Sequence, residues 1–486
     1  MIFYELFVRS FFDSNDDGIG DLNGITQKLD YLQTLGIDGI WLLPIMKSAS
    51  FHGYTIIDFY SINPLYGNFD DLKKLIKIAH EKNIKIILDI PINHTSVKCQ
   101  WFQKAINGDK KYVDYYVWQN EKTDINEKRH WDNSPIWFKY KDKYFYGLFG
   151  SSSPDLNFEN PELWEEMKGI FKFWLDLGID GFRLDAAKHI FDYNIEKGKF
   201  EYQHEKTIKF WKEMVDYIKS INENSIIVSE IWDSPEVVKK YHGLFDIEFN
   251  FPLSYEIKDA VKFQDPHLLV KGIKNTLSHY IKGNVESVSG NFLTNHDMNR
   301  LVSELNNDIN KVKLAYSILF TLPGYQFIYY GEELGMKGLN LDVNFTEDSQ
   351  EPFQWYENGF GPGQTEWKGC KYNPPYSNIS YESERNDIDS LLNYIKTLIK
   401  FRKDNIWLSN ARIDNIRNNR YFISYSLIGK NNKFDVYHNF KNQPININIK
   451  NTEIQLLNGS FVKNKNIIKL NGHSTIIIKN IKNIKN

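Results

Sequence analysis

Eight short apolar runs recur along most of the chain, each bounded by glycine, proline or polar residues. They lie at residues 3–9, 38–44, 84–93, 180–185, 225–232, 245–250, 288–297 and 325–333. Runs of this length predict buried β-strands. Between them the apolar spacing becomes helical, as at Leu72, Leu75, Ile76 and Ala79 and in a longer pattern from Leu22 to Leu35.

The passage from helix to strand is marked twice by nearly the same phrase, LGIDGI at 35–40 and LGIDGF at 177–182. The first glycine of each phrase can supply a left-handed helix stop, and the residues after it enter a strand. Eight strand–helix units predict an α/β chain folded as a closed parallel (β/α)8 TIM barrel. An open doubly wound sheet is the alternative, but the count of eight favours the barrel.

Two regions interrupt this alternation. Residues 94–160 are aromatic and turn-rich, and we expect them to form an inserted domain B after the third strand, over the barrel mouth. Residues 405–486 are short alternating strands, which predict a C-terminal antiparallel β-sandwich domain C. The barrel domain A is then expected in two parts, 1–93 and 161–404.

Composition narrows the class of partner. The 486 residues carry a net charge of −3, which argues against nucleic acid or an anionic membrane as a partner. Aromatics make up 15%, and such side chains suit flat apolar ligands such as sugar rings. Two distant cysteines, Cys99 and Cys370, form no disulfide framework. We expect a monomer without a membrane span, cytoplasmic as given, or secreted or periplasmic if a leader was removed.

The stretch GFRLDAAKH, Gly181 to His189, places two charges inside an apparently buried strand. Arg183 and Asp185 are two residues apart, so both side chains point to the same face. A plain surface ion pair is the simpler reading, but a pair at the end of a barrel strand carries a desolvation cost. Active sites of such barrels lie at the carboxyl ends of the strands.

Other predicted strands also end in polar residues: Asp89, Asn93, His94, Glu230, His296 and Asp297. Carboxylates that converge repel one another, and at least one should have a raised pKa. Glycoside hydrolysis needs one carboxylate as nucleophile and one carboxylic acid as proton donor. Arg183 is expected to keep Asp185 ionised, whereas the apolar neighbours of Glu230 favour its protonated form.

Five segments together resemble the sequence blocks of the α-amylase family of retaining glycoside hydrolases, family 13. They are DIPINH, SPDLN, GFRLDAAKH, SEIW and FLTNHD, at 89–94, 153–157, 181–189, 229–232 and 292–297. The resemblance implies a barrel with an inserted domain B and a C-terminal domain C. It also implies that Asp185 is the nucleophile, Glu230 the general acid/base and Asp297 the transition-state stabiliser.

The same resemblance implies residues that bind the substrate. Those next to the cleaved bond would be Tyr54, His94, Arg183 and His296, and those on the leaving side Lys188 and His189. Either His94 or His296, taken alone, also fits an ordinary core histidine. Candidate stacking platforms for sugar rings are Trp232, Phe149, Trp131 and Trp137, and core packing is the alternative for each single Trp.

A calcium site is expected in the loop DSNDDGIGD. Its oxygen donors alternate, as in a helix–loop–helix calcium loop: Asp13, Asn15, Asp17, Asp21 and the carbonyl of Ile19. The closing glutamate of that loop is missing, and a solvated acidic turn is the alternative. Similar loops in the family bind calcium. The resemblance also implies a second calcium site, formed by Asn93, Asp155 and the carbonyl of His189.

Three features bear on specificity. Lys188 and His189 resemble the leaving-side pair of α-amylases, and Thr55 stands where exo-acting α-glucosidases use an acid. Asn157, in contrast, resembles the oligo-1,6-glucosidase group. The prediction is an endo-acting α-amylase that hydrolyses internal α-1,4 bonds of starch, glycogen and maltooligosaccharides. The alternatives are an α-glucosidase or oligo-1,6-glucosidase, a 4-α-glucanotransferase, and a catalytically silent carbohydrate-binding scaffold.

Overall fold

The computed structural model describes residues 1–277, 287–340, 347–449 and 453–479. Its centre is a closed parallel barrel in the order β1-β14-β13-β12-β11-β8-β5-β2. The strands are β1 (Ile2–Leu6), β2 (Gly39–Leu42), β5 (Lys85–Ile90), β8 (Gly181–Leu184), β11 (Ile226–Ser229), β12 (Ile247–Phe249), β13 (Val288–Asn291) and β14 (Tyr325–Tyr329). Each of the eight apolar runs overlaps one of them, so the predicted barrel is confirmed.

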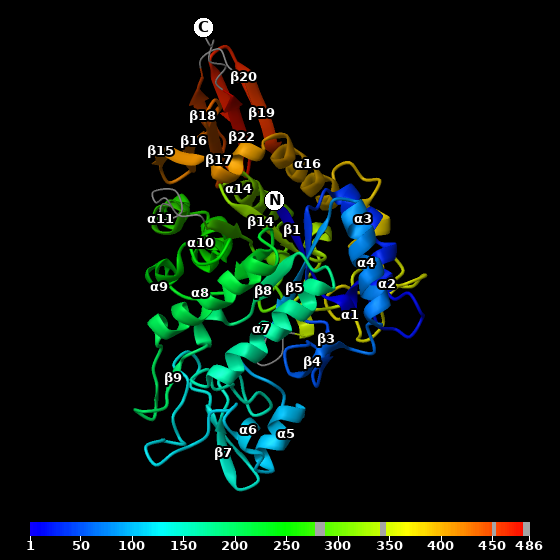
Figure 1. Cartoon of the computed structure of the whole chain (residues 1–486). Helices are drawn as coiled ribbons and strands as arrows, with labels where there is room; N and C mark the ends of the chain where they lie inside the picture. The colour runs from blue at the N-terminus through cyan, green and yellow to red at the C-terminus, as the bar shows by residue number, and fades with distance from the viewer. Residues whose placement is uncertain (278–286, 341–346, 450–452, 480–486) are drawn as a thin grey trace.

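Helices follow the barrel strands and surround the barrel (Figure 1). The longer ones are α4 (Phe69–Glu81), α7 (Pro161–Asp176), α8 (His204–Ile221), α10 (Phe251–Lys262), α14 (Ile309–Thr321) and α16 (Leu391–Asp404). Shorter ones are α1 (Val8–Phe11), α9 (Pro235–Val238), α11 (Pro266–Gly272), α13 (Leu301–Glu304) and α15 (Tyr381–Glu384). The pattern from Leu22 to Leu35 forms two helices, α2 (Leu22–Gln27) and α3 (Leu29–Leu35). Gly36 and Gly178 have positive φ angles at the ends of α3 and α7, as the repeated phrase predicts.

The segment between β5 and α7 builds a small aromatic unit at the lower end of the molecule (Figure 1). It contains α5 (Gln100–Ile106), α6 (Lys110–Val113) and the antiparallel pair β6 (Trp137–Tyr140) and β7 (Lys143–Tyr146). A second hairpin joins it from the loop after β8, formed by β9 (Tyr193–Asn194) and β10 (Lys199–Phe200). The small core that results contains Val117, Ile136, Trp137, Tyr146, Leu148, Tyr193 and Phe200.

Trp137 belongs to this small core, which corrects its interpretation as a stacking platform. Its side chain is 4% exposed and packs against the rings of Tyr146 and Tyr193, with centroids 5.5 and 5.1 Å away. A ring covered on both sides by protein cannot receive a sugar.

A further hairpin, which the apolar pattern did not predict, follows β2. Its strands are β3 (Met46–Ser48) and β4 (Ile56–Ile62), and the loop between them carries Tyr54. The strands are interrupted by register shifts and partly exposed, so their sequence lacks a clean alternation.

The C-terminal region forms two antiparallel sheets at the end of the molecule opposite the inserted unit (Figure 1). One sheet contains β15 (Arg412–Asn418), β16 (Phe422–Ile428), β17 (Lys433–Asn439), β22 (Thr475–Lys479) and β19 (Glu453–Asn458). The other contains β18 (Ile445–Asn448), β21 (Ile467–Leu470) and β20 (Phe461–Asn464). In the described part of the chain, no helix combines the length and apolar character of a membrane span. Cys99 and Cys370 are both free thiols.

Candidate active site

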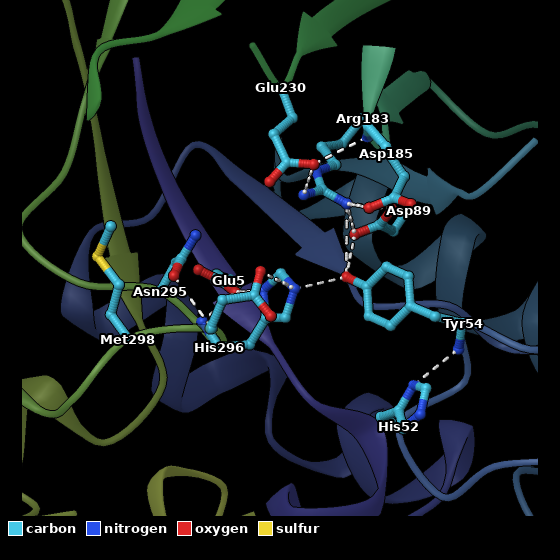
Figure 2. A network of polar contacts seen from close by, with 12 residues as sticks. Glu5, His52, Tyr54, Asp89, Arg183, Asp185, Glu230, Asn295, His296 and Met298 are labelled. Atoms are coloured by element: carbon cyan, nitrogen blue, oxygen red, sulfur yellow. Dashed lines mark hydrogen bonds and ion pairs between the residues drawn. The ribbon is translucent and has the colours of Figure 1, made fainter. Parts of the chain in front are cut away.

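Arg183 and Asp185 stand at the carboxyl end of β8 and contact each other, as their spacing predicts. Arg183 Nη1 donates to Asp185 Oδ1 over 2.6 Å (Figure 2). The guanidinium is buried completely, and Asp185 is 9% exposed. Because side chains alternate between the two faces of a strand, Arg183 and Asp185 both lie in the barrel mouth. A substrate there can reach the carboxylate but not the arginine.

Arg183 also pairs with two carboxylates from neighbouring strands. Nη1 lies 2.8 Å from Asp89 Oδ1, and Nη2 lies 2.8 Å from Glu230 Oε2. Glu230 Oε2 accepts a further hydrogen bond from the backbone N–H of Ala186. One guanidinium therefore holds three buried carboxyl groups in fixed positions around it.

The two candidate catalytic carboxyls, Asp185 and Glu230, both have raised pKa values. Burial raises the pKa of Asp185 to about 6, although the charge of Arg183 opposes the shift. Burial also raises the pKa of Glu230, again against Arg183, and the charge of Asp185 adds to the rise. Arg183 therefore acts on both groups, whereas the sequence suggested that it serves Asp185 alone.

Asp89 is the buried partner that fixes this arginine. It is 0% exposed in β5, and its Oδ2 accepts hydrogen bonds from Tyr54 Oη at 2.8 Å and Trp41 Nε1 at 3.1 Å. Asp89 thereby links Arg183 to Tyr54, whose ring stands beside the site. Its place in the DIPINH block was the signal for it, but its role emerges only from these contacts.

A second cluster joins β1 to the end of β13. His296 Nδ1 lies 2.6 Å from Glu5 Oε1, and its Nε2 lies 3.0 Å from Asp297 Oδ2. Tyr54 Oη is 2.8 Å from the same Nε2, which connects the cluster to Asp89 (Figure 2). Burial would raise the pKa of Asp297, but the adjacent His296 lowers it below its usual value. Glu5 was not identified from the sequence.

His94 and the leaving-side pair Lys188 and His189 are also buried near the site. Burial lowers the pKa of His94 to about 4, so its ring is neutral, and Nδ1 lies 3.1 Å from Asn93 Oδ1. Lys188 Nζ donates to Asp233 Oδ2 at 2.8 Å. His189 Nδ1 lies 2.9 Å from the carboxylate of Asp192. Neither acidic partner was identified from the sequence.

Three aromatic side chains present partly open faces around these groups. Trp131 is 51% exposed, while Phe149 and Trp232 are each 39% exposed. The rings of Trp131 and Phe149 lie 5.8 and 5.6 Å from that of His189. Trp232 stacks on Phe251 at 4.6 Å, and part of its ring remains exposed. These faces have the character that sugar rings prefer.

Thr55 and Asn157, whose identities bear on substrate specificity, are held by local hydrogen bonds. Thr55 Oγ1 donates to Ser50 Oγ at 2.7 Å and is buried. Asn157 Nδ2 donates to the carbonyl of Asp114 at 3.2 Å. The side chain at position 55 is therefore a neutral hydroxyl occupied by its neighbours.

The N-terminal acidic loop offers only hard oxygen donors, as calcium requires. Asp13 accepts the backbone N–H groups of Asn15, Asp16 and Gly18, and Asp21 caps α2 at Gly24. Asp17 accepts the N–H of Ile19. Within the described ranges, no three acidic, His or Cys side chains gather closely enough to hold a metal ion. The donor chemistry fits calcium, but the carboxylates also hold the loop by themselves.

The second candidate metal site contains an unsatisfied carboxylate. Asp155 Oδ1 accepts the N–H of Leu148, whereas the buried Oδ2 has no hydrogen-bond partner among the described residues. Burial and the charge of Asp192 raise the pKa of Asp155 well above its usual value. Asn93 Nδ2 donates to the carbonyl of His189 at 2.8 Å, and the Asn93 side chain also lies against Asp155, so the three expected ligands lie together.

Comparison with known proteins agrees with this site. Residues 5–411 match the family model described as the catalytic domain of alpha amylase. The chain is 41% identical over 447 residues to a 4-alpha-glucanotransferase of Thermotoga maritima, covering 92% of this chain and 97% of that one. It is 41% identical over 484 residues to Alpha-amylase 3 of Dictyoglomus thermophilum, covering 98% and 93%. The crystal structure of an alpha-amylase from H. orenii superposes with a TM-score of 0.89 at 38% identity, covering 98% of both chains.

Proposed function

Because the chain belongs to the α-amylase family, a family of glycoside hydrolases and transglycosylases active on α-glucans, we propose that it is an endo-acting α-amylase. It would cleave internal α-1,4-glucosidic bonds of starch, glycogen and maltooligosaccharides with retention of configuration. The observation that carries the proposal is the single buried guanidinium of Arg183, which holds Asp185 and Glu230 within reach of one another at the barrel mouth.

In the first step, an oxygen of ionised Asp185 attacks the anomeric carbon. The bond to the leaving sugar oxygen breaks while protonated Glu230 donates its proton to that oxygen. The raised pKa of Glu230 suits a proton donor, since a carboxyl must retain its proton near neutral pH to serve as an acid. The result is a glycosyl ester on Asp185 and a free sugar chain.

In the second step, ionised Glu230 takes a proton from the acceptor hydroxyl, which attacks the anomeric carbon and releases Asp185. The lowered pKa of Asp297 keeps that carboxylate charged, so it can stabilise the positive charge that develops on the sugar ring in both steps. If water is the acceptor, the reaction is hydrolysis. If a sugar hydroxyl is the acceptor, it is transfer.

Two features support endo action: the residue at position 55, and the residues that would bind the sugar on the leaving side of the cleaved bond. Thr55 is a buried neutral hydroxyl where an exo-acting enzyme would hold a terminal glucose with a carboxylate. Lys188 and His189, fixed by Asp233 and Asp192, provide polar groups for a sugar beyond the cleaved bond. Trp232, Trp131 and Phe149 provide stacking faces for the same chain.

A second candidate function is 4-α-glucan transfer with the same two steps. The relative from Thermotoga maritima, named a 4-alpha-glucanotransferase, supports it at the same identity as the amylase relative. The two functions differ in the acceptor, so they differ in whether reducing ends accumulate. A catalytically silent scaffold is not favoured, because Asp185, Glu230 and Asp297 are all present at one site.

The test uses a maltooligosaccharide whose non-reducing end is chemically blocked, with products separated by length and reducing ends counted. Endo-hydrolysis predicts shorter blocked products and a steady rise in reducing ends. Transfer predicts longer and shorter products with a constant number of reducing ends. Release of glucose from an unblocked substrate alone would contradict endo action, and Asp185→Asn should abolish every one of these products.

We also propose that the N-terminal loop binds calcium through Asp13, Asn15, Asp17, Asp21 and the carbonyl of Ile19, and that Asn93, Asp155 and the carbonyl of His189 form a second site. The oxygen-only donor set supports the first site, and Asp155 Oδ2, which has no hydrogen-bond partner in the described part of the chain, supports the second. Calcium would serve stability, since neither site contains Asp185 or Glu230. Chelation should lower the unfolding temperature, and Asp17→Asn and Asp155→Asn should each remove part of that response. An unfolding temperature indifferent to chelator and added calcium would refute both sites.

A further inference from the structure

Glu5 is a charged residue near the carboxyl end of the barrel strand β1, and the proposed reaction does not use it. Its side chain is 1% exposed, and its Oε1 accepts two hydrogen bonds from one residue, His296: from the backbone N–H at 3.1 Å and from Nδ1 at 2.6 Å. A buried carboxylate costs several kcal/mol unless it is paired, so this arrangement requires an explanation.

The hydrogen bonds around the other ring nitrogen fix where its proton lies. Tyr54 Oη has one hydrogen, which points to Asp89 Oδ2 at 2.8 Å. At His296 Nε2, 2.8 Å away, Tyr54 Oη must therefore accept, and Nε2 carries a hydrogen. Asp297 Oδ2, 3.0 Å from the same nitrogen, is a second acceptor for it.

Both ring nitrogens of His296 thus face acceptors, Glu5 on one side and Asp297 with Tyr54 on the other. A ring that donates from both nitrogens is an imidazolium. The two flanking carboxylates raise the pKa of His296 well above its usual value, although burial opposes the shift. Without Glu5, Nδ1 would have no negative partner, and the ring would keep only the hydrogen on Nε2.

We propose that Glu5 is a positioning residue for the reaction: it holds His296 as an imidazolium, and through that charge it keeps the carboxylates of Asp185 and Asp297 ionised. The proposal rests on the proposed glycosidase chemistry of the same site. Glu5 touches no reacting atom. It acts through His296, which stands between β1 and the carboxylate cluster (Figure 2).

The positive charge of His296 acts on more carboxylates than Asp297, with which it is in contact. His296 lowers the pKa of Asp297, and it also opposes the upward shifts at Asp89 and Asp185. The charged and titratable groups that face this cluster are Glu5, His52, Tyr54, Asp89, Arg183, Asp185, Glu230 and Asp297. Burial lowers the pKa of His52 to about 4, so His52 adds no charge near neutral pH.

Glu5→Gln tests the proposal because it removes the charge and keeps the size and the acceptor for the backbone N–H. The expected result is a lower kcat, by about 10- to 100-fold, as for loss of the outer carboxylate that orients a metal-binding histidine in other enzymes. KM should change little. The acid limb of the pH profile of kcat/KM should move toward higher pH by on the order of half a unit, because Asp185 and Asp297 lose a nearby positive charge.

Glu333→Gln is the matched control. Glu333 is also a fully buried carboxylate of the barrel, but its partners are the hydroxyls of Tyr4 and Tyr31. It should reproduce any loss of stability without moving the acid limb. Histidine-selective NMR supplies a readout independent of turnover, since the His296 ring should change from an imidazolium to a neutral ring in Glu5→Gln.

The double variant Glu5→Gln/His296→Asn separates a route through His296 from a general defect. If Glu5 acts through His296, adding Glu5→Gln to His296→Asn leaves the acid limb where His296→Asn alone puts it. A folded Glu5→Gln protein with an unmoved acid limb and an imidazolium signal at His296 would overturn the proposal. Failure of the glycosidase assignment would appear differently, as absence of any cleavage by the parent enzyme.

Discussion

Replacement of Arg183 by Met should shift the pH range of activity more than any other single change in the site. The guanidinium contacts Asp185, Glu230 and Asp89 at 2.6 to 2.9 Å, and all of these groups are buried. Methionine fills a similar length without the charge. Breaking a buried ion pair by removing one partner costs about 3–5 kcal/mol, so the free energy of unfolding in urea should fall by about this amount.

The effect on activity follows from the pKa of Asp185. With Arg183 in place that pKa is about 6, so about nine-tenths of the nucleophile is ionised at neutral pH. A rise of about two units on losing the adjacent cation would leave about one-tenth ionised. Ionisation alone then lowers kcat/KM at neutral pH about tenfold, and the acid limb moves to about pH 8.

The assay is kcat/KM for a maltooligosaccharide as a function of pH, for the parent, Arg183→Met and Arg183→Lys. The Lys variant keeps a charge but not the planar geometry that reaches three carboxylates, so its limb should lie between the other two. Arg300→Met is the control, because Arg300 is equally buried but pairs with Glu332. A folded Arg183→Met enzyme whose acid limb stays near pH 6 would refute the reasoning.

Three further changes test other parts of the site. Asp89→Asn removes the buried charge that contacts both Arg183 and Tyr54. The free energy of unfolding in urea should fall by about 3–5 kcal/mol, and unchanged stability would contradict that pairing. Trp232→Ala removes a ring that is 39% exposed and stacks on Phe251, so stability should fall by about 1–3 kcal/mol. KM for long maltooligosaccharides should rise severalfold, and an unchanged KM would exclude a stacking role. Lys188→Met removes the partner of Asp233 and should slow cleavage of long substrates more than of short ones. Competition between the two lengths measures this difference, and equal slowing would argue against a role of Lys188 on the leaving side.

The sequence allowed the barrel to be predicted because each of its strands lies in a short and mostly apolar run, as expected for strands covered on both faces. The carboxylates at the strand ends could be located for the same reason: a charge such as Asp185 stands out at the end of an apolar run. The hairpin of β3 and β4 was not predicted, because its strands are irregular and half exposed and give no clear period.

Partnership between distant residues could not be predicted in the same way. Glu5 lies 291 positions from His296, and nothing in the run FYELFVR indicates which residue its carboxylate meets. Lys188 was assigned to the leaving side, but its partner Asp233 lies beyond the next strand. Trp137 was one candidate stacking platform, and its burial depends on Tyr193, which belongs to a different loop.

Because Tyr193 helps to bury Trp137, hybrids of this enzyme with its relatives require both of the segments that these residues come from. Tyr193 and Phe200 come from the loop after β8, yet they complete the small core whose other members lie between Val117 and Leu148. A chimera that exchanges residues 94–160 alone would combine core residues of one protein with Tyr193 and Phe200 of the other. Crossover points should therefore be chosen in pairs, so that the hairpin of β9 and β10 travels with the segment it packs against.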